Sequence, residues 1–127
     1  MIKDFLIISF TGQNDKIGLK INNNFFIHNF QNNNQNNEIL TSTILNFTNK
    51  HKVNISEQFT ILVNMGPGRF SSIRIALSVV KGIKISTKAN IFGFKNSNLL
   101  QFNLANIEVL INKNLITKKL IKPLYLS

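Results

Sequence analysis

The most distinctive stretch of the sequence is a turn at Gly66-Pro67-Gly68, between a short apolar segment and a helical one. Glycine lets a backbone turn tightly and approach a ligand, and the free N–H groups at a helix start attract anions. The turn lacks the Lys-Ser/Thr ending of a phosphate-binding P-loop and the glycine spacing of a dinucleotide fingerprint. Two interpretations therefore stay open: an anion site, and a tight turn that only aims the following helix.

Phe70 and Arg74 follow this turn and complete the set of turn residues that we single out. Arg74 lies near the predicted helix start, where its charge opposes the helix dipole. We therefore expect Arg74 to pair with a group of this protein or of a partner.

Residues that usually carry catalysis are scarce. His28 and His51 lie far apart in the sequence and have no acid at metal-ligand spacing, and Ser71 has no evident base or orienting acid. The predicted first strand has no acid in its apolar part. We therefore predict no catalytic residue, no metal ligand and no cofactor. The acids are Asp4, Asp15, Glu38, Glu57 and Glu108.

The segment 71–85 carries more apolar residues than one buried helix face needs. Ile75 and Val79 add apolar surface beside the face that a sheet would cover. One interpretation is that the sheet and the helix 38–50 cover all of it, and the other is that a second protein docks there. The predicted partner interface comprises Leu40, Ile44, Phe47, Ser71, Ile75, Ser78, Val79 and Gly82, of which Ser71, Ser78 and Gly82 form a track of small residues.

Alternating strands and helices must position these residues. Apolar alternation and short apolar runs predict strands at 4–11, 16–21, 25–30, 59–64 and 89–94. Helical periodicity predicts helices at 38–50, capped by Asn37, at 71–85, and more weakly at 97–104. The order βββαβαβα predicts an α/β fold with a mixed five-stranded sheet, in which an antiparallel meander joins parallel strands.

The C-terminal region is less regular. Residues 107–111 and 115–121 read as a hairpin around 112–114 or as frayed extended segments. We therefore predict one lobe at 1–105 and a short extension at 106–127.

Composition limits the class of protein. With 127 residues, 43% of them hydrophobic, and no cysteine, the chain fits one globular domain of a reducing compartment. The apolar run 5–8 is shorter than the roughly 7–15 apolar residues of a signal peptide or the ~20 of a membrane span, so we expect a cytoplasmic protein without a membrane segment.

The net charge of +10 has two explanations. Clustered Lys and Arg bind phosphate backbones. Thirteen of the 15 basic residues are Lys, however, and the chain also holds 21 Asn, which favours AT-rich codon usage as the source of the excess. Both explanations stay open.

Residues 61–75 (ILVNMGPGRFSSIRI), together with the order of elements, resemble the TsaB (YeaZ) family of tRNA threonylcarbamoyladenosine biosynthesis. The turn of that family reads Gly-Pro-Gly-Ser-Phe-Thr-Gly-Leu-Arg-Ile. The ending Pro123-Leu124-Tyr125-Leu126 also resembles the family's Pro-x-Tyr-Leu ending. In the turn, Gly66, Pro67, Gly68, Phe70, Arg74 and Ile75 match, whereas Arg69, Ser71, Ser72 and Ile73 differ.

The resemblance implies a ribonuclease-H-like lobe of the actin-like ATPase (ASKHA) superfamily. It also implies a non-catalytic, cytoplasmic dimerisation scaffold for a TsaD-type catalytic subunit, with a TsaE-like ATPase in the same complex, indirect contact with tRNA, and a homodimer when alone.

Two departures from the family pattern matter. Ser9 stands where the family's first strand ends in an acid. Only 23 residues follow Leu104, so we expect most of the family's second lobe to be missing. Residues 106–127 then read as a remnant of that lobe. The alternatives are a small basic RNA-binding module that contacts tRNA and a degenerate actin-like ATPase.

Overall fold

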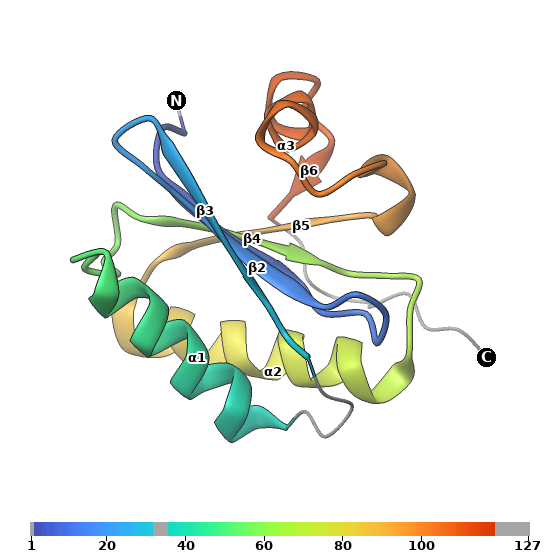
Figure 1. Ribbon diagram of the computed structural model, residues 1–127, viewed down its shortest axis with the longest axis horizontal. Helices are drawn as coiled ribbons and strands as arrows, with labels where there is room; N and C mark the ends of the chain where they lie inside the picture. Colours follow the sequence, from blue (N-terminus) through green and yellow to red (C-terminus); the bar gives the residue numbers. More distant parts are fainter. Residues whose placement is uncertain (1, 32–35, 119–127) are drawn as a thin grey trace.

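A computed structural model describes residues 2–31 and 36–118. Its centre is a six-stranded sheet in the order β3-β2-β1-β4-β5-β6 (Figure 1). β1, β4 and β5 run parallel, and β2, β3 and β6 are antiparallel to their neighbours. The strands are β1 (Phe5–Ser9), β2 (Lys16–Ile21), β3 (Asn24–Asn29), β4 (Thr60–Asn64), β5 (Asn90–Phe94) and β6 (Ile116–Thr117).

The second and third strands of the antiparallel meander are joined by a turn whose residues adopt the left-handed backbone conformation. Asn22 and Asn23, at φ 50° and 69°, join β2 to β3 in a two-residue loop. Asparagine adopts this conformation more readily than most residues, because its short polar side chain can form hydrogen bonds with nearby groups. The pairing continues into β1, where Phe5 lies opposite Lys20 and Ser9 opposite Lys16.

Helices cover both faces of the sheet (Figure 1). α1 (Asn37–Lys50) and α2 (Phe70–Thr87) lie on one face, and α3 (Leu104–Asn112) lies on the other. Successive strand residues point to opposite faces, so β1 supplies both cores: Leu6 and Ile8 pack under α1 and α2, and Phe5 and Ile7 pack under α3.

The predicted order βββαβαβα is present, and β6 adds a sixth strand to the expected five. The two long helices match their predicted ranges within two residues at each end. The cap of α1 is Asn36 rather than Asn37, because the Asn36 side chain accepts a hydrogen bond from the Ile39 N–H at 2.9 Å.

The sequence-based assignment was wrong between residues 97 and 112, whereas β6 lies within the segment 115–121 that was expected to be extended. A short 3-10 helix, η1, occupies Asn96–Asn98, and α3 begins where a helix was expected to end. The expected hairpin strand 107–111 lies inside α3, where Ile107 and Leu110 are fully buried against the sheet. The predicted lobe boundary after residue 105 also falls inside this helix. The ending 123–126 lies outside the described residues.

Among residues 2–31 and 36–118, no helix is both long and apolar enough to span a membrane.

Candidate functional site

The carboxyl ends of β1 and β4 meet at one edge of the sheet, where a buried amide organises the chain. Asn64 ends β4 and is fully buried. Its Nδ2 donates to Ser9 Oγ at 3.2 Å and to Asn96 Oδ1 at 3.0 Å, and its Oδ1 accepts from the Gly66 N–H at 2.9 Å. One side chain therefore joins the end of β1, the turn after β4 and the start of η1.

The Gly66-Pro67-Gly68 turn needs its glycines for two different reasons. Gly66 has a φ of 95°, which L side chains rarely adopt, and precedes a cis peptide bond to Pro67. Gly68 is limited by space instead, because a Cβ there would lie 2.8 Å from Thr11 Cβ and 3.0 Å from Thr11 O. The Arg69 N–H donates to the same Thr11 carbonyl at 2.9 Å, which fixes the turn against the end of β1.

Asp15 holds the loop that faces this turn. Its Oδ1 accepts hydrogen bonds from the backbone N–H groups of Thr11 and Gly12, both at 2.9 Å. Burial raises the pKa of the Asp15 carboxyl above its ordinary 3.8, while these N–H groups and the charge of Arg69 act to lower it. The Arg69 side chain lies across Gly12, where a Cβ would be only 2.6 Å from Arg69 Cδ.

The polar groups at this edge thus bond mainly to one another. No cluster of three or more His, Cys, Asp or Glu that could hold a metal ion occurs in the described part of the chain. Of the two interpretations of the turn, these contacts support the tight turn that positions α2.

Arg74 and Phe70, the other two predicted turn residues, lie together on the first turns of α2. The Arg74 guanidinium carbon lies 5.7 Å from the centre of the Phe70 ring. Both side chains are exposed, and both line a hollow of about 280 Å³ with Ser71 and Ile75. Within this chain, the Arg74 guanidinium thus lies beside an aromatic ring of its own helix.

A second, larger hollow of about 570 Å³ lies between α1 and α2. Both hollows are lined by Asn37 and Ser78, whose side chains share a hydrogen bond of 3.2 Å from Nδ2 to Oγ. The two hollows therefore follow one line between the helices, and we call them together the α1–α2 groove. It is the main candidate for a docking site.

The structure brings six predicted interface residues to the line of the groove, five from α2 and one from α1. The five from α2 differ in burial. Ser71, Ser78 and Gly82 are exposed, and Ile75 is half-buried. Val79 is only 6% exposed and belongs to the core. Val79 was predicted to lie on a free apolar surface, but it forms part of the floor of the groove.

The three predicted residues of α1 do not form an exposed surface. Leu40 and Ile44 are fully buried, although Ile44 also lines the larger hollow. Phe47 lies on the side of α1 that faces β3, where its ring centre is 5.3 Å from that of His51 and 6.1 Å from that of His28. The two histidines thus belong to an aromatic cluster that packs α1 against β3.

Sequence reasoning missed the residues that α1 presents beside the groove. Leu45 lines the larger hollow and is 52% exposed. Val53 and Ile55, in the loop after α1, also line it. The sequence did contain a signal for Leu45. The buried face of α1, which includes Ile44, was predicted correctly, and the next residue of a helix lies outside that face.

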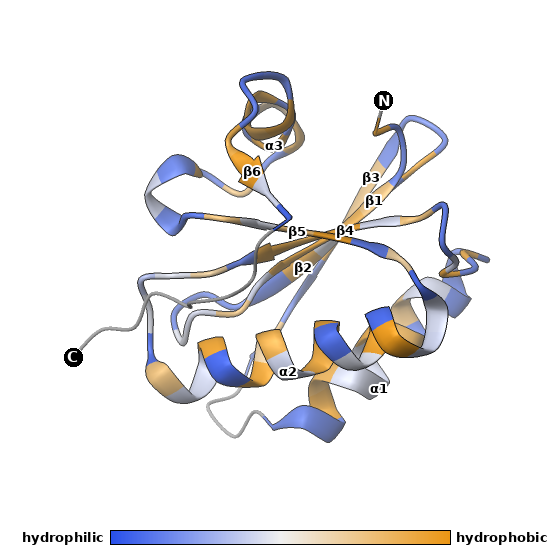
Figure 2. Ribbon diagram, turned by 180° about the vertical axis from the view of Figure 1, so that it is seen from behind, coloured by the Kyte–Doolittle hydropathy of each residue, from blue (hydrophilic) through white to orange (hydrophobic). Residues whose placement is uncertain are grey.

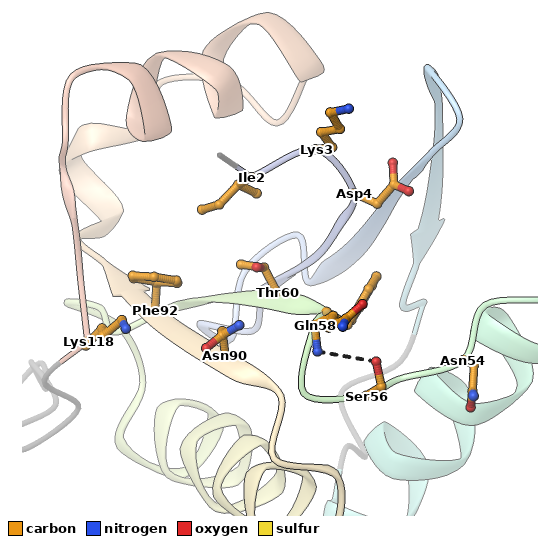
Figure 3. A pocket seen from close by; sticks show the side chains of 11 residues that line it. Ile2, Lys3, Asp4, Asn54, Ser56, Gln58, Thr60, Asn90, Phe92 and Lys118 are labelled. Atoms are coloured by element: carbon orange, nitrogen blue, oxygen red, sulfur yellow. Dashed lines mark hydrogen bonds between the residues drawn. The ribbon is translucent and has the colours of Figure 1, made fainter.

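Another cavity, of about 520 Å³, lies at the amino ends of β1, β4 and β5 (Figure 3). Its lining combines the ring of Phe92 with polar side chains such as Thr60 and Asn90. Lys118 stands over the Phe92 ring, 5.6 Å from its centre. None of these residues was predicted as a site, and Asp4 is the one acid that lines the cavity among residues 2–31 and 36–118.

Comparison with protein-family models and with curated proteins gave no match. Among solved structures, the chain is similar to an uncharacterized protein with similarity to peptidase YeaZ from Pseudomonas aeruginosa, at a TM-score of 0.70 and 18% identity, over 78% of this chain and 46% of that one. It is also similar to YeaZ from Pseudomonas aeruginosa, at a TM-score of 0.70 and 16% identity, over 89% and 50%. The chain spans about half the length of these structures. The likeness confirms the predicted fold.

Proposed function

We propose that this chain, which has the fold of YeaZ, is a non-catalytic partner of a TsaD-type subunit in tRNA threonylcarbamoyladenosine modification. The resemblance of residues 61–75 to the TsaB turn and the likeness of fold to YeaZ support the family role. The α1–α2 groove is where the catalytic subunit docks. A TsaE-like ATPase joins the same complex. This chain contacts tRNA only indirectly, as a member of the complex.

The observation that carries the proposal is the groove itself. Its floor is apolar and rigid, because Ile44 and Val79 belong to the packed core. Leu45 and Ile75 stand partly exposed along its line. Burying an aliphatic side chain contributes roughly 1.5–3 kcal/mol, so a few such side chains from each protein stabilise a complex.

Gly82 offers a test that leaves the fold intact. It lines the groove, and nothing lies within 4 Å of a Cβ placed there. Gly82→Gln would extend a side chain into the groove, whereas Gly82→Ala adds one methyl group. Both variants should unfold at a higher temperature, because replacing a glycine inside a helix stabilises it by about 0.5–1 kcal/mol.

Affinity for the TsaD-type subunit of the same organism, measured by calorimetry, then separates the variants. We expect Gly82→Gln to weaken binding by about tenfold or more, equivalent to roughly 1.4 kcal/mol, and Gly82→Ala to bind much like the unmodified chain. Equal affinity for all three proteins would place the docking surface elsewhere. No binding by the unmodified chain would refute the partner role.

A further inference from the structure

A row of basic side chains follows the outer side of α2. Arg74, Lys81 and Lys88 are seven residues apart, and all three are exposed. Seven residues make almost two helical turns, so the Arg74 and Lys81 side chains lie nearly in line, about 10 Å apart along the helix. Lys88 follows directly after the helix as its C-cap, with a φ of 61°. Lys84 is also exposed, between the last two. The segment 70–88 contains no acid, so no carboxylate of α2 neutralises the row.

This row borders the α1–α2 groove. Arg74 itself lines the smaller hollow, next to Ser71 and Ile75. Lys81 adjoins Gly82, which lines the larger one. A molecule seated between α1 and α2 therefore brings one of its flanks over the basic row.

Apolar side chains lie among these cations. Ile85 is 83% exposed and Phe70 is 50% exposed, and both share the outer side of α2 with the row. Figure 2 shows hydrophobic and hydrophilic residues alternating along this helix. A phosphate backbone offers oxygens and sugars to such a surface and leaves Ile85 largely uncovered, whereas a protein surface supplies apolar contacts as well as charge. The mixture favours a protein partner over a nucleic acid.

We propose that the surface docking on the groove is acidic, with Asp or Glu carboxylates opposite Arg74 and Lys81 and apolar side chains that cover Ile85. This inference rests on the proposed function and names the chemistry of the partner's surface. Complementary charge at the rim of an interface speeds association and makes it depend on salt. The row thus selects and orients the catalytic subunit, and the groove holds it.

The test compares two charge reversals of equal size. Arg74→Glu/Lys81→Glu alters the row, and Lys3→Glu/Lys113→Glu lowers the net charge equally at exposed positions away from α2. Affinity for the TsaD-type subunit is measured by biolayer interferometry at about 50 and about 300 mM NaCl, where screening differs strongly. We expect the first variant to bind about tenfold more weakly at low salt and to approach the unmodified chain at high salt. The control should stay within about twofold of the unmodified chain.

Carbodiimide coupling gives a second readout. It joins a lysine amine to a carboxylate in contact with it, so we expect peptides that link Lys81 or Lys88 to Asp or Glu of the subunit. Equal weakening by both reversals would mean that only net charge matters, and would overturn the inference.

Three further outcomes would also overturn the inference. If both reversals bind as the unmodified chain does, the acidic partner surface is refuted but the proposed docking stays in place. If the unmodified chain does not bind the subunit, both proposals are refuted.

A tRNA transcript is the probe for the third outcome, in which the partner is a nucleic acid. If Arg74→Glu/Lys81→Glu loses only transcript binding and keeps its affinity for the subunit, the row is an RNA surface.

Discussion

Asn64 and the two turn glycines act together at the carboxyl edge of the sheet. The Asn64 side chain accepts a hydrogen bond from the Gly66 N–H, and Gly68 leaves room for Thr11, which lies just after β1. The sequence singled out both glycines, because Gly-Pro-Gly between a strand and a helix indicates a tight turn. It did not single out Asn64, since 21 asparagines dilute the signal of any one of them.

Gly68→Val should destabilise the protein by about 1–3 kcal/mol, because the first added carbon already meets Thr11 Cβ and Ile73 Cδ1, at 2.8 and 3.1 Å. The matched control is Gly82→Val, at a helical position with open space. Chemical denaturation of both variants measures the difference. A Gly68→Val protein as stable as the control would show that the turn relaxes without cost.

Asp15 predicts a specific dependence of stability on pH. Because burial raises the folded-state pKa of this carboxyl, the folded protein binds a proton more readily than the unfolded chain between the unfolded pKa and the raised one. The contribution of Asp15 to stability therefore grows as pH falls through that window and is lost as pH rises.

Asp15→Asn removes this titration and keeps an oxygen that can accept from Thr11 and Gly12. We expect the melting temperature of the unmodified chain, relative to that of Asp15→Asn, to increase between pH 7 and pH 4. A difference that is constant with pH, or that decreases on acidification, would contradict this reading.

At the scale of the elements, the sequence predicted the two helices of the groove. It did not predict how much of the surface of α2 is buried by α1. Helical periodicity gives the direction of Val79 around the axis of α2. It does not say how far the side chains of α1 reach across, so Val79 was assigned to a free surface although α1 and the sheet bury it. Ile75, one turn earlier, keeps part of its surface exposed.

α3 was missed although its signals are present. Asn103 caps the helix by accepting from the Asn106 N–H at 2.9 Å, and Ile107, Leu110 and Ile111 have helical spacing. The helix is short, and the Asn-Lys-Asn triplet at its end resembles a hairpin turn. The competing turn signal therefore prevailed in a segment where periodicity covers only two turns.

Leu110→Ala should lower the free energy of unfolding by about 2–5 kcal/mol, because the Leu110 side chain is fully buried on the face of α3 that packs against the sheet. Leu100→Ala is the control, since Leu100 is 87% exposed and should change stability by less than about 0.5 kcal/mol. Equilibrium unfolding in urea compares them. Similar values for both variants would mean that α3 is not an integral part of the fold.

At the scale of the whole molecule, the fold leaves two contrasting regions on α2. Its amino end is fixed by the turn against β1, and its exposed sides form the groove and the basic row. The core residues that form the floor of the groove also hold α2 on the sheet. The docking that we propose on this surface therefore needs no change in the fold.

The formation of N6-threonylcarbamoyladenosine in a tRNA transcript tests the central claim most directly. The reaction contains the TsaD-type and TsaE-like proteins of the same organism and their activated threonylcarbamoyl donor, with or without this chain. We expect modified nucleoside, measured by mass spectrometry, only when the chain is present, and strongly reduced formation with Gly82→Gln. Equal yields without the chain, or full activity with Gly82→Gln despite lost binding, would contradict the account.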